Sequence, residues 1–170
     1  MVYVHVDKPP GHLIAALGLP RGAKVLAVAA LPDAVTWLIA ANLGLGVAST
    51  EAQEFHPWDQ IERAKMRPAD GVLTVTYSDT RRTVEYTLRS KDKRFASIVN
   101  ERVKASVVEV EHVPVDGGQV IVALRRRPTD QSVYLQELPG PGVDPAVAEP
   151  LVRAARARLG EAAGLPSGTW

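Results

Sequence analysis

The chain has 170 residues, of which 46% are hydrophobic and 23% charged, with a net charge of +1 and no cysteine. This length suits one ordinary domain with a small appended element, and the absence of cysteine excludes disulfides, thiolate metal sites and cysteine nucleophiles. A net charge this close to zero gives the whole chain no electrostatic preference for nucleic acid or a membrane surface. The sequence holds 23 Val and 23 Ala against 2 Phe and 2 Met, which predicts a core of small and β-branched side chains.

The amino-terminal residues and the most apolar stretch bear on location. Residues 1–6 alternate apolar and polar side chains, without the basic and apolar regions of a secretory signal. Residues 25–49 carry one charge, Asp33, but turn signals at 31–33 and 42–44 divide them into runs of strand length. We therefore expect buried strands rather than a transmembrane helix, and a cytoplasmic protein.

The first third of the chain predicts a short helix followed by strands. Apolar spacing indicates a helix over 11–18, and strands are expected over 24–30, 35–41 and 43–49. The connections between these strands are too short for crossover helices, so they should form an antiparallel meander. Their apolar residues are continuous rather than alternating. Both faces of this sheet should therefore be covered, by the domain's own later elements or by another subunit.

The middle third predicts three further strands and a helix. Strands are expected over 55–66, 72–77 and 83–88, and the last two form the clearest hairpin in the sequence. Trp58 is expected to supply a large buried area to the core. The apolar period then becomes helical, which predicts a helix over 92–106, capped by Ser90 or Asp92, with Phe95, Ile98, Val99 and Val103 facing the core.

The last third returns to strands and ends in a helix. Strands are expected over 107–115, 119–126 and 132–138, and Asp116-Gly117-Gly118 is a strong hairpin signal between the first two. The final helix begins either at Asp144-Pro145 or at Pro150 and runs to about residue 159–161. Without βαβ alternation, the order of elements predicts an α+β fold with mostly antiparallel pairing.

Motifs of known chemistry are sparse. Gly44-Leu45-Gly46 lacks the third glycine and the following helix of a dinucleotide-binding loop, so close packing within a sheet is the better interpretation. The four histidines, at positions 5, 12, 56 and 112, have no metal-ligand spacing. Glu109 and Glu111 share a strand face, which we interpret as a solvated surface rather than an acid and base pair. We expect no metal, no cofactor and no catalytic residues.

Basic residues gather in the middle third, where residues 53–105 hold eleven basic and eight acidic side chains, a net charge of +3. Arg63, Lys65 and Arg67 share one strand face. The candidate ligand-binding patch is formed by Arg81, Arg82, Lys93 and Arg94, around the end of the hairpin and the start of the helix. It suits phosphate or anionic lipid headgroups. The alternative is a charged edge that discourages strand aggregation, and the lack of interleaved aromatic residues argues against nucleic acid.

Three segments resemble pleckstrin-homology-like (PH-like) domains of small bacterial, particularly actinobacterial, proteins. Residues 55–64 (FHPWDQIERA) contain a P-W-x-x-I strand motif, 71–75 (GVLTV) a G-x-L-x-V strand, and 94–108 (RFASIVNERVKASVV) resemble the terminal helix. The resemblance implies a roll of two bent antiparallel sheets over residues 20–108, closed at one end by a helix. Such a domain has seven strands where we count six, and the seventh would lie within 48–58.

The remaining residues, 109–163, form a predicted extension of three strands and a helix packed on this domain, followed by a tail over 164–170. The extension would cover the second face of the strands in 24–49. The resemblance carries no catalytic residues and does not name a ligand. We expect a non-enzymatic protein-interaction or assembly module, acting through a sheet edge, the helix flank or self-association as a homo-oligomer. The alternative is binding of anionic lipid headgroups by the basic patch.

Overall fold

The computed structural model describes residues 8–90 and 93–168, which divide into two compact units. Unit 1 comprises residues 1–104 and unit 2 residues 105–170. The division lies at the end of a helix, four residues before the predicted domain end at 108. The fold is α+β with three antiparallel sheets, as the sequence predicts. Within the described residues, no helix is both long and apolar enough to cross a membrane.

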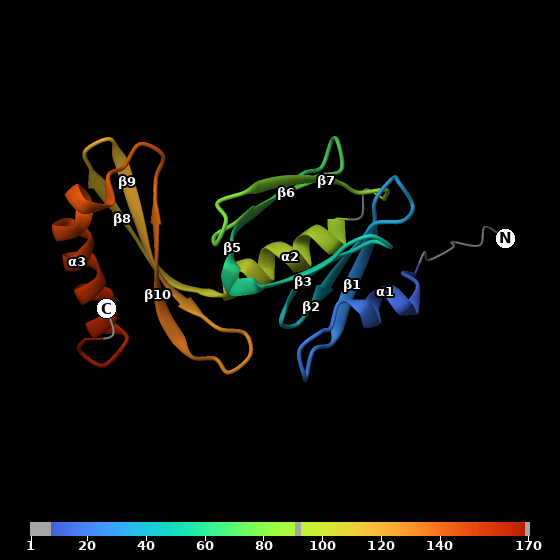
Figure 1. Ribbon diagram of the computed structural model, residues 1–170, viewed down its shortest axis with the longest axis horizontal. Coiled ribbons are helices and arrows are strands. Elements are labelled where there is room, and N and C mark those ends of the chain that lie inside the picture. Colours follow the sequence, from blue (N-terminus) through green and yellow to red (C-terminus); the bar gives the residue numbers. More distant parts are fainter. Residues whose placement is uncertain (1–7, 91–92, 169–170) are drawn as a thin grey trace. The chain divides into compact units, whose positions relative to one another are not determined.

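Unit 1 contains two sheets and two α-helices (Figure 1). Sheet A has the order β1-β2-β3-β4, and sheet B has the order β5-β6-β7. The helix α1 (Gly11–Ala16) precedes sheet A, and α2 (Lys93–Ala105) follows sheet B. The strands are β1 (Val25–Ala30), β2 (Trp37–Ala41), β3 (Gly44–Ala48), β4 (Gln53–Pro57), β5 (Ile61–Arg67), β6 (Val72–Tyr77) and β7 (Thr83–Thr87).

One predicted strand of this unit is wrong. The single strand expected over 55–66 is two strands, β4 and β5, which belong to different sheets. The 3₁₀ helix η1 (Trp58–Gln60) separates them. Trp58 is 2% exposed, and its indole Nε1 donates to the carbonyl oxygen of Ala41 at 2.9 Å. The buried indole thus fixes the corner where the chain leaves sheet A, and β4 supplies the seventh strand.

The continuous apolar strands are explained by cover on both faces of sheet A. Leu38, Ala40 and Leu45 join the main core with residues of sheet B and α2. Trp37 and Ile39 alternate with them along β2 and pack with Leu13 and Leu17 at the opposite face. The second cover is therefore α1 and the residue after it, within unit 1 itself. The cover seen here comes from an earlier element of the domain rather than the later one expected, and cover by the carboxy-terminal extension stays a prediction.

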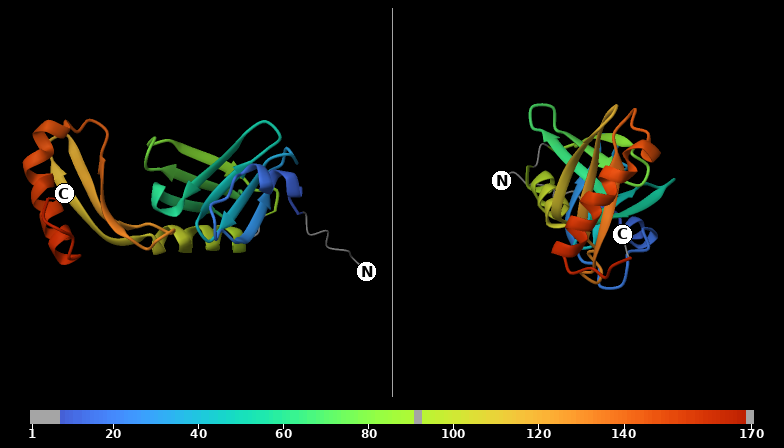
Figure 2. Two further views of the ribbon diagram at one scale, coloured as in Figure 1. Left: turned by 60° about the horizontal axis from the view of Figure 1, so that its bottom comes forward. Right: turned by 90° about the vertical axis from the view of Figure 1, so that its left-hand side faces the viewer.

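The helix α2 has the apolar face that the sequence predicts. Phe95, Val99 and Val103 are at most 5% exposed and belong to the main core of unit 1. In the left view of Figure 2, α2 runs along the lower side of this unit. Of its two predicted caps, Asp92 lies outside the described residues. Burial of its apolar face therefore packs α2 against the strands of sheet B.

Unit 2 is a three-stranded sheet with one helix. Sheet C has the order β10-β9-β8, formed by β8 (Val107–Val115), β9 (Gly118–Arg126) and β10 (Val133–Pro139). The helix α3 (Pro145–Ala162) buries Ala148, Val152, Ala155 and Leu159 against valines of β8 and β9. The predicted packing of this extension on unit 1 stays a prediction.

The two predicted starts of the last helix are resolved in favour of the earlier one. Asp144 caps α3, because its Oδ1 accepts a hydrogen bond from the Ala146 amide at 2.9 Å. Pro145 occupies the first turn, and Pro150 lies inside the helix. A proline there removes one backbone donor from the helix. Residues 164–168, the described part of the predicted tail, contain no helix or strand.

Candidate functional site

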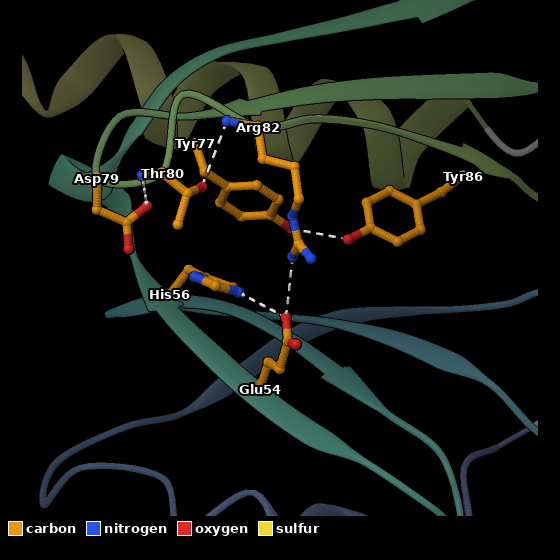
Figure 3. A network of polar contacts seen from close by, with 7 residues as sticks. All are labelled: Glu54, His56, Tyr77, Asp79, Thr80, Arg82 and Tyr86. Atoms are coloured by element: carbon orange, nitrogen blue, oxygen red, sulfur yellow. Dashed lines mark hydrogen bonds and ion pairs between the residues drawn. The ribbon is translucent and has the colours of Figure 1, made fainter.

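Polar side chains meet between β4 of sheet A and the β6–β7 hairpin of sheet B (Figure 3). Glu54 and His56 lie two apart on β4, so both side chains lie on one face of the strand. The Glu54 Oε2 atom lies 3.1 Å from His56 Nε2 and 3.4 Å from a terminal nitrogen of Arg82. The His56 ring lies against the Tyr77 ring, with 4.2 Å between centroids. We call these residues, together with Tyr86, the polar network.

The two tyrosines form the buried end of this network. Their hydroxyl oxygens lie 2.8 Å apart, and the residues are 0% and 8% exposed for Tyr77 and Tyr86. Burial is the main cause that raises the pKa of Tyr77, and the hydrogen bond to Tyr86 adds to it. Burial also raises the pKa of Tyr86. Both hydroxyls therefore stay protonated at neutral pH.

The arginines at this hairpin are paired with acids. The Arg82 guanidinium lies 5.6 Å from the centroid of the Tyr77 ring and also pairs with Glu54. Arg81 has a positive φ of 56° in the turn, and its side chain lies 3.4 Å from Glu62 Oε2. An anion that binds here competes with a carboxylate partner. The arginine charges at this turn are therefore engaged in ion pairs within the protein, which disfavours a ligand site here.

The predicted basic patch is divided between two places. Arg81 and Arg82 precede β7, whereas Lys93 and Arg94 begin α2, beyond the end of β7. Five strand residues at about 3.3 Å each place roughly 16 Å between these positions along the strand. The backbone thus carries the two halves of the patch to opposite ends of β7.

A cleft of about 220 Å³ lies between sheet B and α2. Its apolar lining comes from the strand side and from Ala96, and its polar lining comes from α2. We call it the α2 cleft, lined by Ala64, Met66, Pro68, Leu73, Lys93, Ala96, Ser97 and Asn100. Within the described part of the chain β5 has one strand neighbour, β6, so β5 is an edge of sheet B. The cleft therefore lies beside a strand edge, where backbone groups are available for pairing.

The other residues weighed from the sequence are histidines, acids and glycines. Among the described residues there is no group of three or more potential metal ligands, and His5 lies outside them. Glu111 is paired with Arg158 of α3. At Gly44 an added Cβ would lie 2.4 Å from the His56 carbonyl oxygen, and at Gly46 it would lie 2.8 Å from Leu17 Cδ1. Gly44 is therefore needed for close packing against the backbone of β4, as interpreted from the sequence, whereas the neighbour of Gly46 is the flexible end of the Leu17 side chain.

The sequence prediction missed both the polar network and the α2 cleft. The spacing of Glu54 and His56 places them on one strand face, but only the division between β4 and β5 brings that face to Tyr77. For the cleft, the polar Ser97 and Asn100 beside the small, apolar Ala96 were a sequence signal that one flank of the helix is partly open. The order of the strands in sheet B, which makes β5 an edge strand, cannot be predicted from neighbouring residues in the sequence.

Comparisons with family models, with curated proteins and with solved structures find no match for this chain.

Proposed function

We propose that unit 1 is a PH-like roll that acts as a non-enzymatic protein-interaction module. In this proposal an extended segment of a partner protein pairs with the edge of β5, and its side chains enter the α2 cleft. The observation that carries the proposal is the apolar cleft beside an edge strand. The order of four strands, three strands and a helix supports the proposed roll.

Strand addition to a sheet edge is a general mode of peptide recognition. The backbone of the added strand supplies hydrogen bonds, and alternate side chains enter pockets that give specificity. The α2 cleft meets the second requirement, because Ala64, Leu73 and Ala96 are buried at its floor while Ser97 and Asn100 are exposed at its side. The partner is thus expected to place an apolar side chain in the cleft.

The test selects peptides of about twelve residues from a random displayed library on the full chain, long enough to span a strand. Binding of the selected peptides is measured by fluorescence anisotropy. Ser97→Trp fills the cleft from an exposed helix position and should weaken binding at least about tenfold, as expected for a blocked central pocket. Glu101→Trp, also exposed on α2 but outside the cleft lining, should change binding by less than about twofold.

Two results would overturn the proposal: no enriched peptide, or peptides that bind Ser97→Trp as well as the original chain. Thermal unfolding of both tryptophan variants excludes a loss of folding as the cause. Backbone amide shifts at Ala64 and Met66 on peptide addition would locate the peptide on β5. If the edge of β5 instead pairs with a second copy of the chain, sedimentation of the chain without a peptide shows a mass that rises with protein concentration.

Binding of anionic lipid headgroups is the second candidate and receives less support. Unit 1 carries the positive charge of the chain, with fourteen basic and eleven acidic residues in 1–104. However, Arg81 and Arg82 are paired with Glu62 and Glu54. Flotation with phosphatidylserine vesicles tests this candidate directly. Unchanged flotation of the variant in which Arg81, Arg82, Lys93 and Arg94 are all replaced by Ala would remove the patch as its basis.

A further inference from the structure

The strand β5 presents different chemistry on its two faces. Ala64 and Met66 line the α2 cleft, whereas Arg63, Lys65 and Arg67 alternate with them. Because successive side chains of a strand point to opposite faces, these three cations lie on the face of sheet B away from the cleft. A segment added at this edge repeats the same alternation. Half of its side chains would face the cleft, and the other half would lie beside the cations.

The cations along this edge differ in their partners. Arg67 is paired with Asp70 at 3.4 Å and with Glu85 at 3.3 Å. Arg63 and Lys65 are exposed and form no ion pair with any residue in 8–90 or 93–168. The same holds, within those ranges, for Lys93 at the rim of the cleft. Among the described residues, two positive charges on β5 and a third on α2 therefore have no ion-pair partner.

Unpaired positive charge beside a strand edge favours a paired segment that carries negative charge. Opposite charges on adjacent strands stabilise pairing, and like charges directly opposite destabilise it. Complementary charge also raises the rate of encounter and disfavours wrong partners. We infer that the segment bound at β5 is acidic, with Asp or Glu alternating with the apolar residues that enter the α2 cleft. This inference rests on the proposed function and specifies the partner of that same site.

A different role for the cations is protection of the edge. Lysine and arginine on an edge strand discourage pairing between copies of a protein. In that case the charges act against any strand, and the selected peptides need no acidic residues. The two roles therefore differ in the composition of the peptides and in the response of their affinity to salt.

The experiment uses the peptide selection described above and two charge variants of the full chain. The peptides should be enriched in Asp and Glu at alternate positions. The double variant Arg63→Gln with Lys65→Gln should weaken their binding about three- to tenfold, as expected for the loss of two exposed charge pairs. The matched control, Arg21→Gln with Lys24→Gln, removes the same charge from two exposed positions before β1 and should leave affinity within about twofold.

Raising the salt from about 50 to 300 mM should weaken binding to the original chain and have less effect on the double variant. The inference is overturned by peptides without acidic enrichment, or by equal affinities for the double variant and its control. Either result leaves the proposed function standing if Ser97→Trp still blocks binding. If Ser97→Trp has no effect, the proposed function itself is wrong. Self-association of the double variant with unchanged peptide affinity supports protection of the edge instead.

Discussion

The two basic regions of unit 1 differ in what surrounds their charges. At the β6–β7 turn, Arg81 and Arg82 are paired with carboxylates, and the Arg82 guanidinium lies over the ring of the buried Tyr77. Along β5, Arg63 and Lys65 have no acidic partner among the described residues, and an apolar cleft lies beside them. Similar residues are thus ion-paired in one place and, among the described residues, without an ion-pair partner in the other. The difference lies in their partners, not in the number of charges.

The largest expected effect comes from removing the support of the cleft. Phe95 is 1% exposed and anchors the first turns of α2 in the core. Phe95→Ala should lower the free energy of unfolding by about 3–5 kcal/mol, through lost burial and the cavity left behind. Chemical denaturation of the full chain measures this change. A loss under about 1 kcal/mol would mean that α2 is not held by this contact.

The polar network predicts a specific loss of stability at alkaline pH. The pKa values of Tyr77 and Tyr86 are raised above the ordinary value of 10.0 because both side chains are buried. The unfolded state therefore releases these protons first, so their stabilising effect is complete below pH 10 and is lost as the pH rises above it.

Denaturation followed at pH values from 8 to about 11.5 measures this slope, together with tyrosinate absorbance. The control replaces both Tyr77 and Tyr86 by Phe, which removes both hydroxyls together and so leaves no partner behind. This variant should lose stability less steeply above pH 10. Equal slopes for the variant and the original chain would show that the buried tyrosines do not carry the effect.

The smallest expected effects on stability come from replacing Arg82, which is ion-paired, and Lys65, which has no ion-pair partner among the described residues. Arg82→Gln should destabilise the fold by about 0–1 kcal/mol, because it removes an exposed ion pair with Glu54 and a contact with Tyr77. Lys65→Gln should change stability by less than about 0.5 kcal/mol. Denaturation at low salt resolves the two. A larger loss for Lys65→Gln would contradict the assignment of β5 charges to binding.

Most elements of the fold could be predicted from local patterns, since alternation and helical spacing are properties of neighbouring residues. The hairpin at Asp116-Gly117 and the helix cap at Asp144 follow from turn and capping preferences. The division of 55–66 was missed because the Pro57-Trp58 corner depends on a distant acceptor, the carbonyl of Ala41. Tertiary contacts of this kind leave no periodic signal.

The candidate site was harder to predict than the fold. Arg81, Arg82, Lys93 and Arg94 are close in sequence, but β7 carries them apart. The cleft combines β5 and β6 with α2, so that Ala64 lies across from residues about thirty positions later in the chain, such as Ser97. Charge clustering along a sequence therefore grouped residues that the fold separates and gave no sign of the cleft, because neither pairing with acids nor strand order can be inferred from composition.

The glycines of β3 have a consequence for which sequences can adopt this fold. Gly44 allows close approach of β4, and Gly46 allows close approach of Leu17 at the end of α1. A hydrophobic pattern alone would accept alanine or valine at either position, because the neighbouring residues are apolar. Sequences that diverge from this one while keeping the fold should therefore retain glycine at position 44, beside the β4 backbone, more strictly than at position 46, beside the flexible end of Leu17. The absence of a side chain here specifies the fold as firmly as a buried side chain does elsewhere.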